Sequence, residues 1–248
     1  IFMTDTVVII PSRLKARRLP NKPIKLINGK EMILHVYEAA KNSNVADVLV
    51  VTPDKIIADI IKKNGGDVFF SKKLHDTGTD RVYEGFKYFY SSKPKIIINL
   101  QGDMPNINPK AITQLNDYIQ KNSCDMCTLA SSIKNQDEIK NKSIVKIITK
   151  NNIENSTFSN VLDFKRDLIS ANDKFIYHHI GIYAFTKEAL MRYVKLKRSK
   201  LEIERDLEQM RALEDKMRIH AGYTSSNPLG VDTNEDLKKV KKEMETNE

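Results

Sequence analysis

The loop that follows the first apolar run of the chain is rich in positively charged side chains. The apolar run covers residues 7–10, and the loop continues to residue 23. Its cations are Arg13, Lys15, Arg17, Arg18 and Lys22, and its prolines are Pro11, Pro20 and Pro23. Because the loop has no glycine, it is not a glycine-rich loop in which backbone N–H groups surround phosphates. Prolines restrict the conformations of a loop, so this segment predicts a cluster of side-chain cations that binds one dense anion.

Two carboxylates are found next to apolar runs further along the chain. Asp103 lies in NLQGDMP, directly after the run at residues 96–100, and Asp232 lies in PLGVDTNED. In open α/β sheets, ligands bind beyond the carboxyl ends of the strands, so we expect the loop and both carboxylates to converge there. Carboxylates bind hard cations such as Mg²⁺, and Arg and Lys neutralise phosphate oxygens. The pattern predicts a nucleoside triphosphate site with magnesium; in the alternative interpretation, Asp232 is only a charge favoured at the start of the last helix.

Alternating strand and helix patterns must position these residues. We expect strands at residues 7–10, 48–51, 68–70, 96–100 and 126–133, and helices at 32–42, 55–64, 80–90 and 110–122. This spacing is typical of parallel βαβ units, whose strands are buried on both faces.

The second half of the chain has a different pattern. We expect shorter strands with turns at residues 143–185, helices at 187–194 and 204–215, a strand at 217–223 and a final helix. That helix begins with TNED, a capping box of Thr233 and Asp236. The prediction is one α/β domain over residues 1–248, with a doubly wound, mostly parallel sheet of Rossmann-like type. An antiparallel elaboration is expected in the second half, at about residues 140–215.

Composition narrows the class of protein. The 41 Lys and Arg against 32 Asp and Glu give a formal charge of +9, but many lysines lie on helix faces and no nucleic-acid-binding motif is present. The apolar runs are too short to cross a bilayer, and no signal-peptide pattern is seen. Cys124 and Cys127 form a single C-x-x-C pair with no second pair to complete a zinc site. We expect a cytoplasmic protein with reduced cysteines that binds neither nucleic acid nor membrane.

Six motifs, in this order, resemble those of one enzyme family. They are IIPSRLKARRLPNKP, HDTGTDR, NLQGDMP, HIGIYAF, LEQMRAL and GVDTNEDL, between residues 7 and 237. The first motif is shared with other sugar nucleotidyltransferases, including CMP-sialate synthetases, whereas the set of six is more specific. The chain resembles the 3-deoxy-manno-octulosonate (Kdo) cytidylyltransferases, also called CMP-Kdo synthetases.

The resemblance implies an activity and a set of site residues. The family uses CTP, Kdo and Mg²⁺ to form CMP-Kdo and pyrophosphate for lipopolysaccharide biosynthesis, and its members are often homodimers. By similarity, the catalytic residues are Arg18, Lys22, Asp103 and Asp232, of which Asp103 and Asp232 hold the metal. The CTP-binding residues are Pro11, Ser12, Arg13, Lys22, His75, Gly78, Thr79 and Gln101. The sugar-binding residues are Gln101, His179, Tyr183, Glu208 and Gln209.

Three positions depart from the family pattern. Asn160 replaces an arginine expected to bind the sugar carboxylate, Met104 replaces a common Glu, and Arg205 replaces an acid. Asparagine offers neither the charge nor the two-pronged geometry of arginine, and Arg205 is one candidate to bind the carboxylate instead. A cytidylyltransferase for another 2-keto acid sugar, such as 8-amino-Kdo or a nonulosonate, is therefore an alternative. A non-catalytic, basic nucleic-acid-binding protein is a third hypothesis, of a different class.

Overall fold

The computed structural model describes residues 5–16, 18–155, 157–167 and 173–246; Arg17 of the opening loop lies outside them. The strands are β1 Thr6–Pro11, β2 Leu26–Ile27, β3 Lys30–Glu31, β4 Asp47–Thr52, β5 Asp67–Phe70, β6 Ile96–Leu100, β7 Met126–Ser131, β8 Lys146–Thr149, β9 Phe158–Lys165, β10 Phe175–Thr186 and β11 Ile219–Tyr223. The helices are η1 Lys22–Ile24, α1 Met32–Asn42, α2 Lys55–Lys63, α3 Gly78–Tyr88, α4 Pro109–Lys121, α5 Gln136–Lys140, α6 Lys187–Tyr193, α7 Lys200–Arg205, α8 Met210–Glu214 and α9 Asn234–Glu245. The strands and helices expected in the first half are confirmed.

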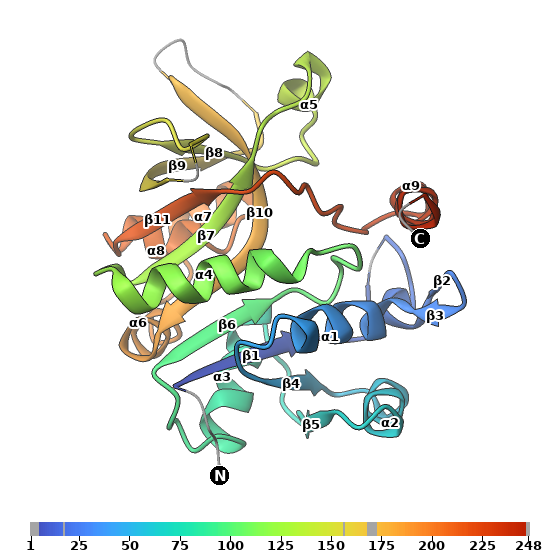
Figure 1. Cartoon of the computed structure of the whole chain (residues 1–248). Helices are drawn as coiled ribbons and strands as arrows, with labels where there is room; N and C mark the ends of the chain where they lie inside the picture. The colour runs from blue at the N-terminus through green and yellow to red at the C-terminus, as the bar shows by residue number, and fades with distance from the viewer. Residues whose placement is uncertain (1–4, 17, 156, 168–172, 247–248) are drawn as a thin grey trace.

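A nine-stranded sheet, in the order β5-β4-β1-β6-β10-β7-β11-β9-β8, runs through the molecule (Figure 1). Its first four strands are parallel. The long strand β10 is antiparallel to both β6 and β7, and β8 pairs back onto β10. The α/β class is therefore confirmed, while the sheet as a whole is mixed: the parallel order holds in the first half and antiparallel pairing dominates the second.

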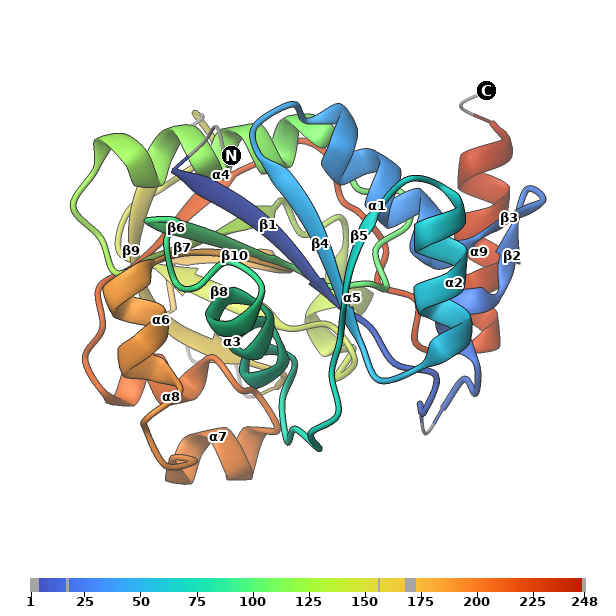
Figure 2. The same cartoon turned by 90° about the horizontal axis from the view of Figure 1, so that it is seen from below.

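Helices cover both faces of the parallel strands, as the alternation of side chains in β1 requires. Val8 and Ile10 pack in one hydrophobic cluster with α1, α2 and α4. Val7 and Ile9 point the other way, into a second cluster with α3, α6 and α8. Figure 2 shows α1 and α4 on one side of β1 and α3 and α6 on the other. Burial on both faces explains the continuous apolar run at residues 7–10.

The second half differs from expectation in two elements. The predicted helix at residues 204–215 is two helices, α7 and α8, because Asp206 adopts a left-handed conformation (φ 52°) that ends α7. Only short strands were expected at residues 143–185, but β10 extends over 12 residues. The capping box of Thr233 and Asp236 at the start of α9 is confirmed. Within the described residues, we find no helix with the length and apolar character needed to span a bilayer.

A buried ion pair joins α7 to α8. Arg211 donates two hydrogen bonds to Glu202, from Nε to Oε2 at 2.8 Å and from Nη2 to Oε1 at 2.7 Å, and only 4% and 1% of the two side chains are exposed. Burial raises the pKa of Glu202, but the bonds from Arg211 and from the Ser199 backbone outweigh it and lower the pKa overall. The Arg211 guanidinium also lies 4.8 Å from the ring centre of Tyr193. This pair fixes the two short helices that follow β10 and α6.

We expect Arg211→Met to lower the free energy of unfolding by about 3–5 kcal/mol, because it leaves the Glu202 carboxylate buried without its partner. Urea denaturation followed by circular dichroism measures the change. Lys30→Met is the matched control, since Lys30 pairs with Glu38 at the surface, and it should cost no more than about 1 kcal/mol. Equal effects of the two substitutions would contradict the structural role of the buried pair.

Candidate active site

A cavity of about 960 Å³ lies at the carboxyl ends of β1 and β6. The opening loop forms part of its wall, and the residues that follow β6, the start of α3 and Asp232 form further parts. The structure thus brings together the segments that the sequence patterns singled out. The size of the cavity is that of a small-molecule site. The position of the cavity agrees with the rule that ligands bind beyond the carboxyl ends of strands.

Lys22 lies between two aspartates in the wall of this cavity. Its Nζ donates to Asp103 Oδ2 at 2.9 Å and to Asp232 Oδ1 at 3.0 Å, and Arg18 Nη2 donates to Asp232 Oδ2 at 2.7 Å. Burial lowers the pKa of Lys22, but the two carboxylates outweigh it, so the pKa is raised. Burial raises the pKa of Asp232, whereas Lys22 and Arg18 lower it overall. Lys22 and Asp232 are therefore charged at neutral pH. Together with Asp103 they form the Lys22 cluster (Lys22, Asp103 and Asp232).

Local backbone geometry explains how these residues meet. Lys22 begins η1, directly after Asn21 in a left-handed conformation (φ 57°). At Gly102 a Cβ atom would lie 3.2 Å from the Pro11 carbonyl oxygen, so glycine permits the end of β6 to approach the end of β1 closely. The backbone N–H of Val231 donates to the Asp103 carbonyl at 2.9 Å, which places Asp232 beside Asp103. The Asp232 carboxylate thus binds two cations, which favours the functional interpretation over a simple helix-terminal charge.

Two buried polar atoms of the cavity wall have no hydrogen-bond partner among the described residues: Ser12 Oγ and Arg81 Nη1. Arg81 is 5% exposed, and burial together with the neighbouring Arg13 lowers its pKa. Unpaired buried polar groups are costly and rare in folded proteins, so both atoms are suited to a ligand. Sequence reasoning included Ser12 but missed Arg81, although Arg81 ends the HDTGTDR motif.

The other predicted CTP-binding residues divide into two groups. Pro11, Arg13, His75, Gly78 and Gln101 all line the cavity. His75 Nε2 lies 2.7 Å from Glu84 Oε2, and Gln101 Nε2 donates to Asn99 Oδ1 at 2.9 Å. Thr79 does not line the cavity: it is 1% exposed, and its hydroxyl donates to Glu208.

Four predicted sugar-binding residues lie outside the cavity lining, which includes only Gln101 of that set. His179, Tyr183 and Gln209 are buried, and Glu208 accepts a hydrogen bond from Thr79. His179 Nε2 lies 3.0 Å from Thr128 Oγ1, and burial, with the neighbouring His178, lowers the pKa of His179 to about 3. Burial raises the pKa of Glu208 despite the bond from Thr79. The structure places His179 beside Thr128 of β7 and Phe164 of β9, and it places Glu208 beside Thr79 of α3.

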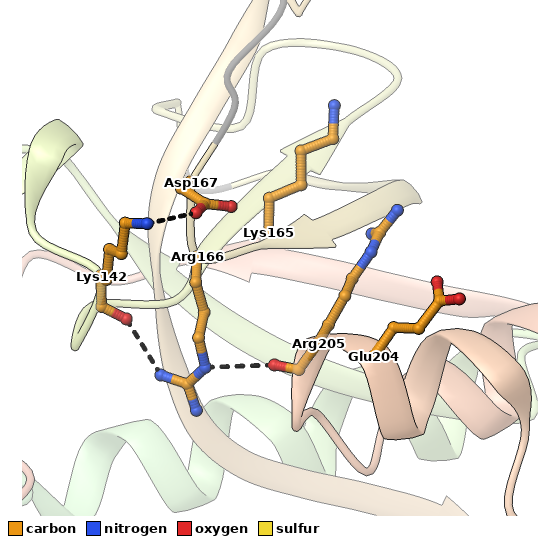
Figure 3. A pocket seen from close by; sticks show the side chains of 6 residues that line it. All are labelled: Lys142, Lys165, Arg166, Asp167, Glu204 and Arg205. Carbon is orange, nitrogen blue, oxygen red and sulfur yellow. Dashed lines mark hydrogen bonds and ion pairs between the residues drawn. The ribbon is translucent and has the colours of Figure 1, made fainter.

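Another wall of the cavity was not predicted. It is formed by Lys142, Ser143, Arg166 and Asp206. The first two lie between α5 and β8, the third follows β9 and the last follows α7, so no local motif links them. Lys142 and Arg166 also line an adjoining cavity of about 360 Å³ with Lys165, Asp167, Glu204 and Arg205 (Figure 3).

The three residues that depart from the family pattern lie outside the lining of the larger cavity. Asn160 is exposed on β9, where its backbone pairs with His220 of β11, and Met104 is buried in the first hydrophobic cluster. Arg205 Nη1 forms an ion pair with Asp163 and also donates to the Phe164 carbonyl at 2.7 Å. None of the three lines the larger cavity, so the structure does not favour Arg205 as the carboxylate-binding group.

The chain is similar to known cytidylyltransferases in sequence and in fold. A family model described as cytidylyltransferase matches residues 7–219. The solved structure of a CMP:2-keto-3-deoxy-manno-octonic acid synthetase complexed with CTP superposes with a TM-score of 0.87 at 32% identity, covering 98% of this chain and 99% of that one. A 4-diphosphocytidyl-2C-methyl-D-erythritol synthase from Anaerococcus prevotii, with a TM-score of 0.67 at 15% identity, shares the fold.

Relatives in sequence define the family more narrowly. A 3-deoxy-manno-octulosonate cytidylyltransferase of Bartonella tribocorum is 37% identical over 239 residues, covering 96% of this chain and 98% of that protein. One from Rhodopseudomonas palustris is 38% identical over 238 residues, covering 96% of each. The chain therefore belongs to the 3-deoxy-manno-octulosonate cytidylyltransferase family, as the six motifs indicated.

Proposed function

We propose that this enzyme transfers CMP from CTP to the anomeric hydroxyl of 3-deoxy-D-manno-octulosonate, giving CMP-Kdo and pyrophosphate for lipopolysaccharide biosynthesis. The observation that carries the proposal is the Lys22 cluster in a cavity whose walls also hold Arg13, Arg18 and Arg81. Cations in this arrangement neutralise a triphosphate. The relatives at 37–38% identity are named for this activity.

Asp103 and Asp232 fit a magnesium ion by the chemistry of their donors. Both carboxylates already bind one shared cation, the Lys22 ammonium, and both are partly open to the cavity. No group of three or more His, Cys, Asp or Glu suited to a metal occurs in the described part of the chain, which agrees with an ion that takes its remaining ligands from phosphate and water. Mg²⁺ held there would neutralise the triphosphate and lower the pKa of the attacking hydroxyl.

The protein's own residues contribute positioning and electrostatic stabilisation. The oxygen of the sugar hydroxyl loses its proton to water and forms a bond to the α-phosphorus, as the bond from that phosphorus to pyrophosphate breaks. Negative charge accumulates on the departing pyrophosphate, and Lys22 with Arg13 and Arg18 stabilises it. The same groups hold CTP in line with the acceptor, which lowers the entropic part of the barrier. His179 is buried, and burial keeps it neutral, so it takes no part as a proton carrier in this scheme.

The proposal extends to the assembly and the location of the enzyme. We propose a cytoplasmic homodimer in which residues 140–215, the antiparallel second half, contribute to the sugar site and to the dimer contact. Exposed Leu162 and Ile203, at 55% and 60%, lie in this segment and offer apolar surface for such a contact. Analytical ultracentrifugation of the wild-type protein measures the oligomeric state.

Pyrophosphate release with CTP, Mg²⁺ and Kdo is the test of the proposed activity, with sialic acid and 8-amino-Kdo in matched reactions. We expect release with Kdo at a kcat/KM at least about tenfold above that with the other two sugars. If pyrophosphate is released only with another acidic sugar, that sugar is the acceptor in place of Kdo, and the proposed mechanism is unchanged. No release with any sugar, together with DNA affinity that collapses with salt, would favour the nucleic-acid-binding alternative.

A further inference from the structure

A buried carboxylate that the proposed reaction does not use lies behind one wall of the cavity. Glu84 belongs to α3, and only 7% of its side chain is exposed. Its Oε2 accepts a hydrogen bond from Ser71 Oγ at 2.5 Å and lies 2.7 Å from His75 Nε2. Ser71 and His75 both belong to the loop that joins β5 to α3 (Figure 2). Of these three residues, His75 lines the cavity and the other two lie behind it.

The surrounding structure holds Glu84 in place. The next residue, Gly85, lies so close to β4 that a Cβ atom there would be 2.5 Å from Val51 Cγ2, so α3 packs tightly against the sheet. The Ser71 N–H donates to the Thr52 carbonyl at 2.9 Å, which ties the start of the loop to the same strand. Glu84 therefore lies between a helix and a loop that are both anchored on β4, as a residue that orients another side chain requires.

Glu84 is ionised at neutral pH and determines which nitrogen of His75 carries hydrogen. Burial raises the pKa of Glu84, but the hydrogen bonds from Ser71 and His75 outweigh it and lower the pKa overall. An ionised carboxylate only accepts hydrogen bonds, so the hydrogen between Glu84 and His75 belongs to Nε2. In the neutral imidazole ring the other nitrogen, Nδ1, is then an acceptor. The carboxylate thereby selects one tautomer of His75.

The Nδ1 atom of His75 has no hydrogen-bond partner among the residues that the structure describes. The ring is bonded through Nε2 to the buried Glu84 and also forms part of the cavity wall. The other cavity-lining residues between positions 74 and 78 are Leu74, Thr77 and Gly78, and none of them is charged. This part of the wall suits the uncharged nucleoside of CTP, whereas the cations of the opening loop suit its triphosphate.

We propose that Glu84 is a positioning residue for CTP: it holds His75 in the tautomer whose Nδ1 accepts a hydrogen bond from the nucleoside. This inference rests on the proposed function, in which CTP occupies the cavity. Cytidine offers suitable donors in the amino group of its base and in the hydroxyl groups of its ribose. Glu84 does not touch the nucleotide and acts through His75. Without the carboxylate, the ring is free to place its hydrogen on Nδ1, and a nitrogen that carries hydrogen cannot accept.

Calorimetric titration with CTP and with inorganic tripolyphosphate separates the nucleoside from the phosphates. Glu84→Ala and His75→Ala should each weaken CTP binding by about 3- to 10-fold, the effect of losing one hydrogen bond between neutral groups. The affinity for tripolyphosphate should change by less than about twofold, because the opening loop is untouched. In pyrophosphate-release assays the KM for CTP should rise by the same factor as the dissociation constant, while kcat at saturating CTP stays within about twofold.

A double substitution tests whether Glu84 acts through His75. Residues that act as one unit do not have additive effects, so the variant that combines Glu84→Ala with His75→Ala should bind CTP no more weakly than His75→Ala alone. A loss equal to the product of the two single losses would overturn the inference. An equal weakening of CTP and tripolyphosphate binding in Glu84→Ala would also overturn it, because a general loosening of the cavity predicts that result.

Ser71→Ala is the matched control for Glu84→Ala. It removes the other hydrogen bond to the same carboxylate oxygen and leaves His75 in contact with Glu84. The affinity for CTP should stay within about twofold of the wild-type value. A loss as large as that of Glu84→Ala would show that Glu84 serves the packing of the loop rather than the orientation of His75, and would overturn the inference.

His75→Gln carries the test if Glu84→Ala does not fold. The glutamine amide can still donate to Glu84, but it has no acceptor at the position of Nδ1, so CTP should bind as weakly as it does to His75→Ala. Unchanged CTP affinity in His75→Gln would overturn the inference. Wild-type enzyme that binds CTP but releases no pyrophosphate with any acidic sugar would overturn the proposed function alone, because the CTP titrations still decide the role of Glu84.

Discussion

Replacing Lys22 with alanine is expected to lower kcat by about 100- to 1000-fold, the loss seen when a preorganised group that stabilises transition-state charge is removed. Only 14% of the Lys22 side chain is exposed, and its ammonium lies between Asp103 and Asp232. Burial lowers its pKa, but the carboxylates raise it above the ordinary value of 10.5. The ammonium is therefore charged throughout the neutral range, and its stabilising charge acts on every turnover. Steady-state pyrophosphate release at saturating CTP and Kdo measures the change.

Folding should be affected far less than catalysis by this substitution. Asp103 and Asp232 are 31% and 47% exposed, so water can solvate them once the ammonium is gone, and the melting temperature should stay near that of the wild-type protein. Lys15→Ala is the matched control, because Lys15 is an exposed cation of the same loop that also lines the cavity. It should cost no more than about tenfold in kcat/KM. Full activity of Lys22→Ala would show that pyrophosphate leaves without the help of this residue.

The raised pKa of Lys22 also determines how its contribution to folding stability changes with pH. A group whose pKa is higher in the folded protein stabilises it fully below the unfolded pKa, and this contribution is lost as the pH rises through the folded pKa. For Lys22 the loss begins only above about pH 10.5, the ordinary value. Lys22 therefore adds no pH dependence to the stability between pH 6 and 9.

Local patterns were sufficient to predict the first half of the fold. The strands of the parallel sheet are buried on both faces, so their sequences are continuous apolar runs bounded by turns. The residues at their carboxyl ends then follow from topology, because parallel strands bring those ends to one edge. This is why the sequence predicted that the opening loop, Asp103 and Asp232 would meet. The stiff, cation-rich loop and the capping box of α9 are likewise local signals.

Residues that depend on long-range packing could not be predicted in the same way. Arg166 reaches the cavity through hydrogen bonds to carbonyls near residues 142 and 206, which no spacing along the chain reveals. The alternation in β10 allowed His179 to face either side, and only the pairing of β10 with β7 places it in the core, beside Thr128. Apolar and charged residues alternate at helical spacing over residues 204–215, which predicts one helix. Asp206, however, ends α7 in a left-handed conformation.

Replacing Asp103 with asparagine is expected to remove Mg²⁺-dependent turnover, with a loss of kcat of about 1000-fold or more. Asparagine has nearly the same shape and can still accept the hydrogen bond from Lys22, whereas it loses the charge that a hard divalent cation requires. The substitution therefore separates the electrostatic part of the site from its packing. Asp103 is partly exposed and lies at the cavity wall, so the melting temperature should change little.

Asp206→Asn provides the matched control for Asp103→Asn. Asp206 also lines the cavity, but its contact with Arg166 is made by its backbone carbonyl, and asparagine tolerates its left-handed conformation. Titrating Mg²⁺ in the presence of CTP, by activity and by calorimetry, should show weakened metal binding only in Asp103→Asn. Turnover with normal Mg²⁺ dependence in Asp103→Asn would refute the metal assignment. A loss of turnover with unchanged metal affinity would mean that Asp103 acts chiefly by orienting Lys22, since the two share a 2.9 Å hydrogen bond.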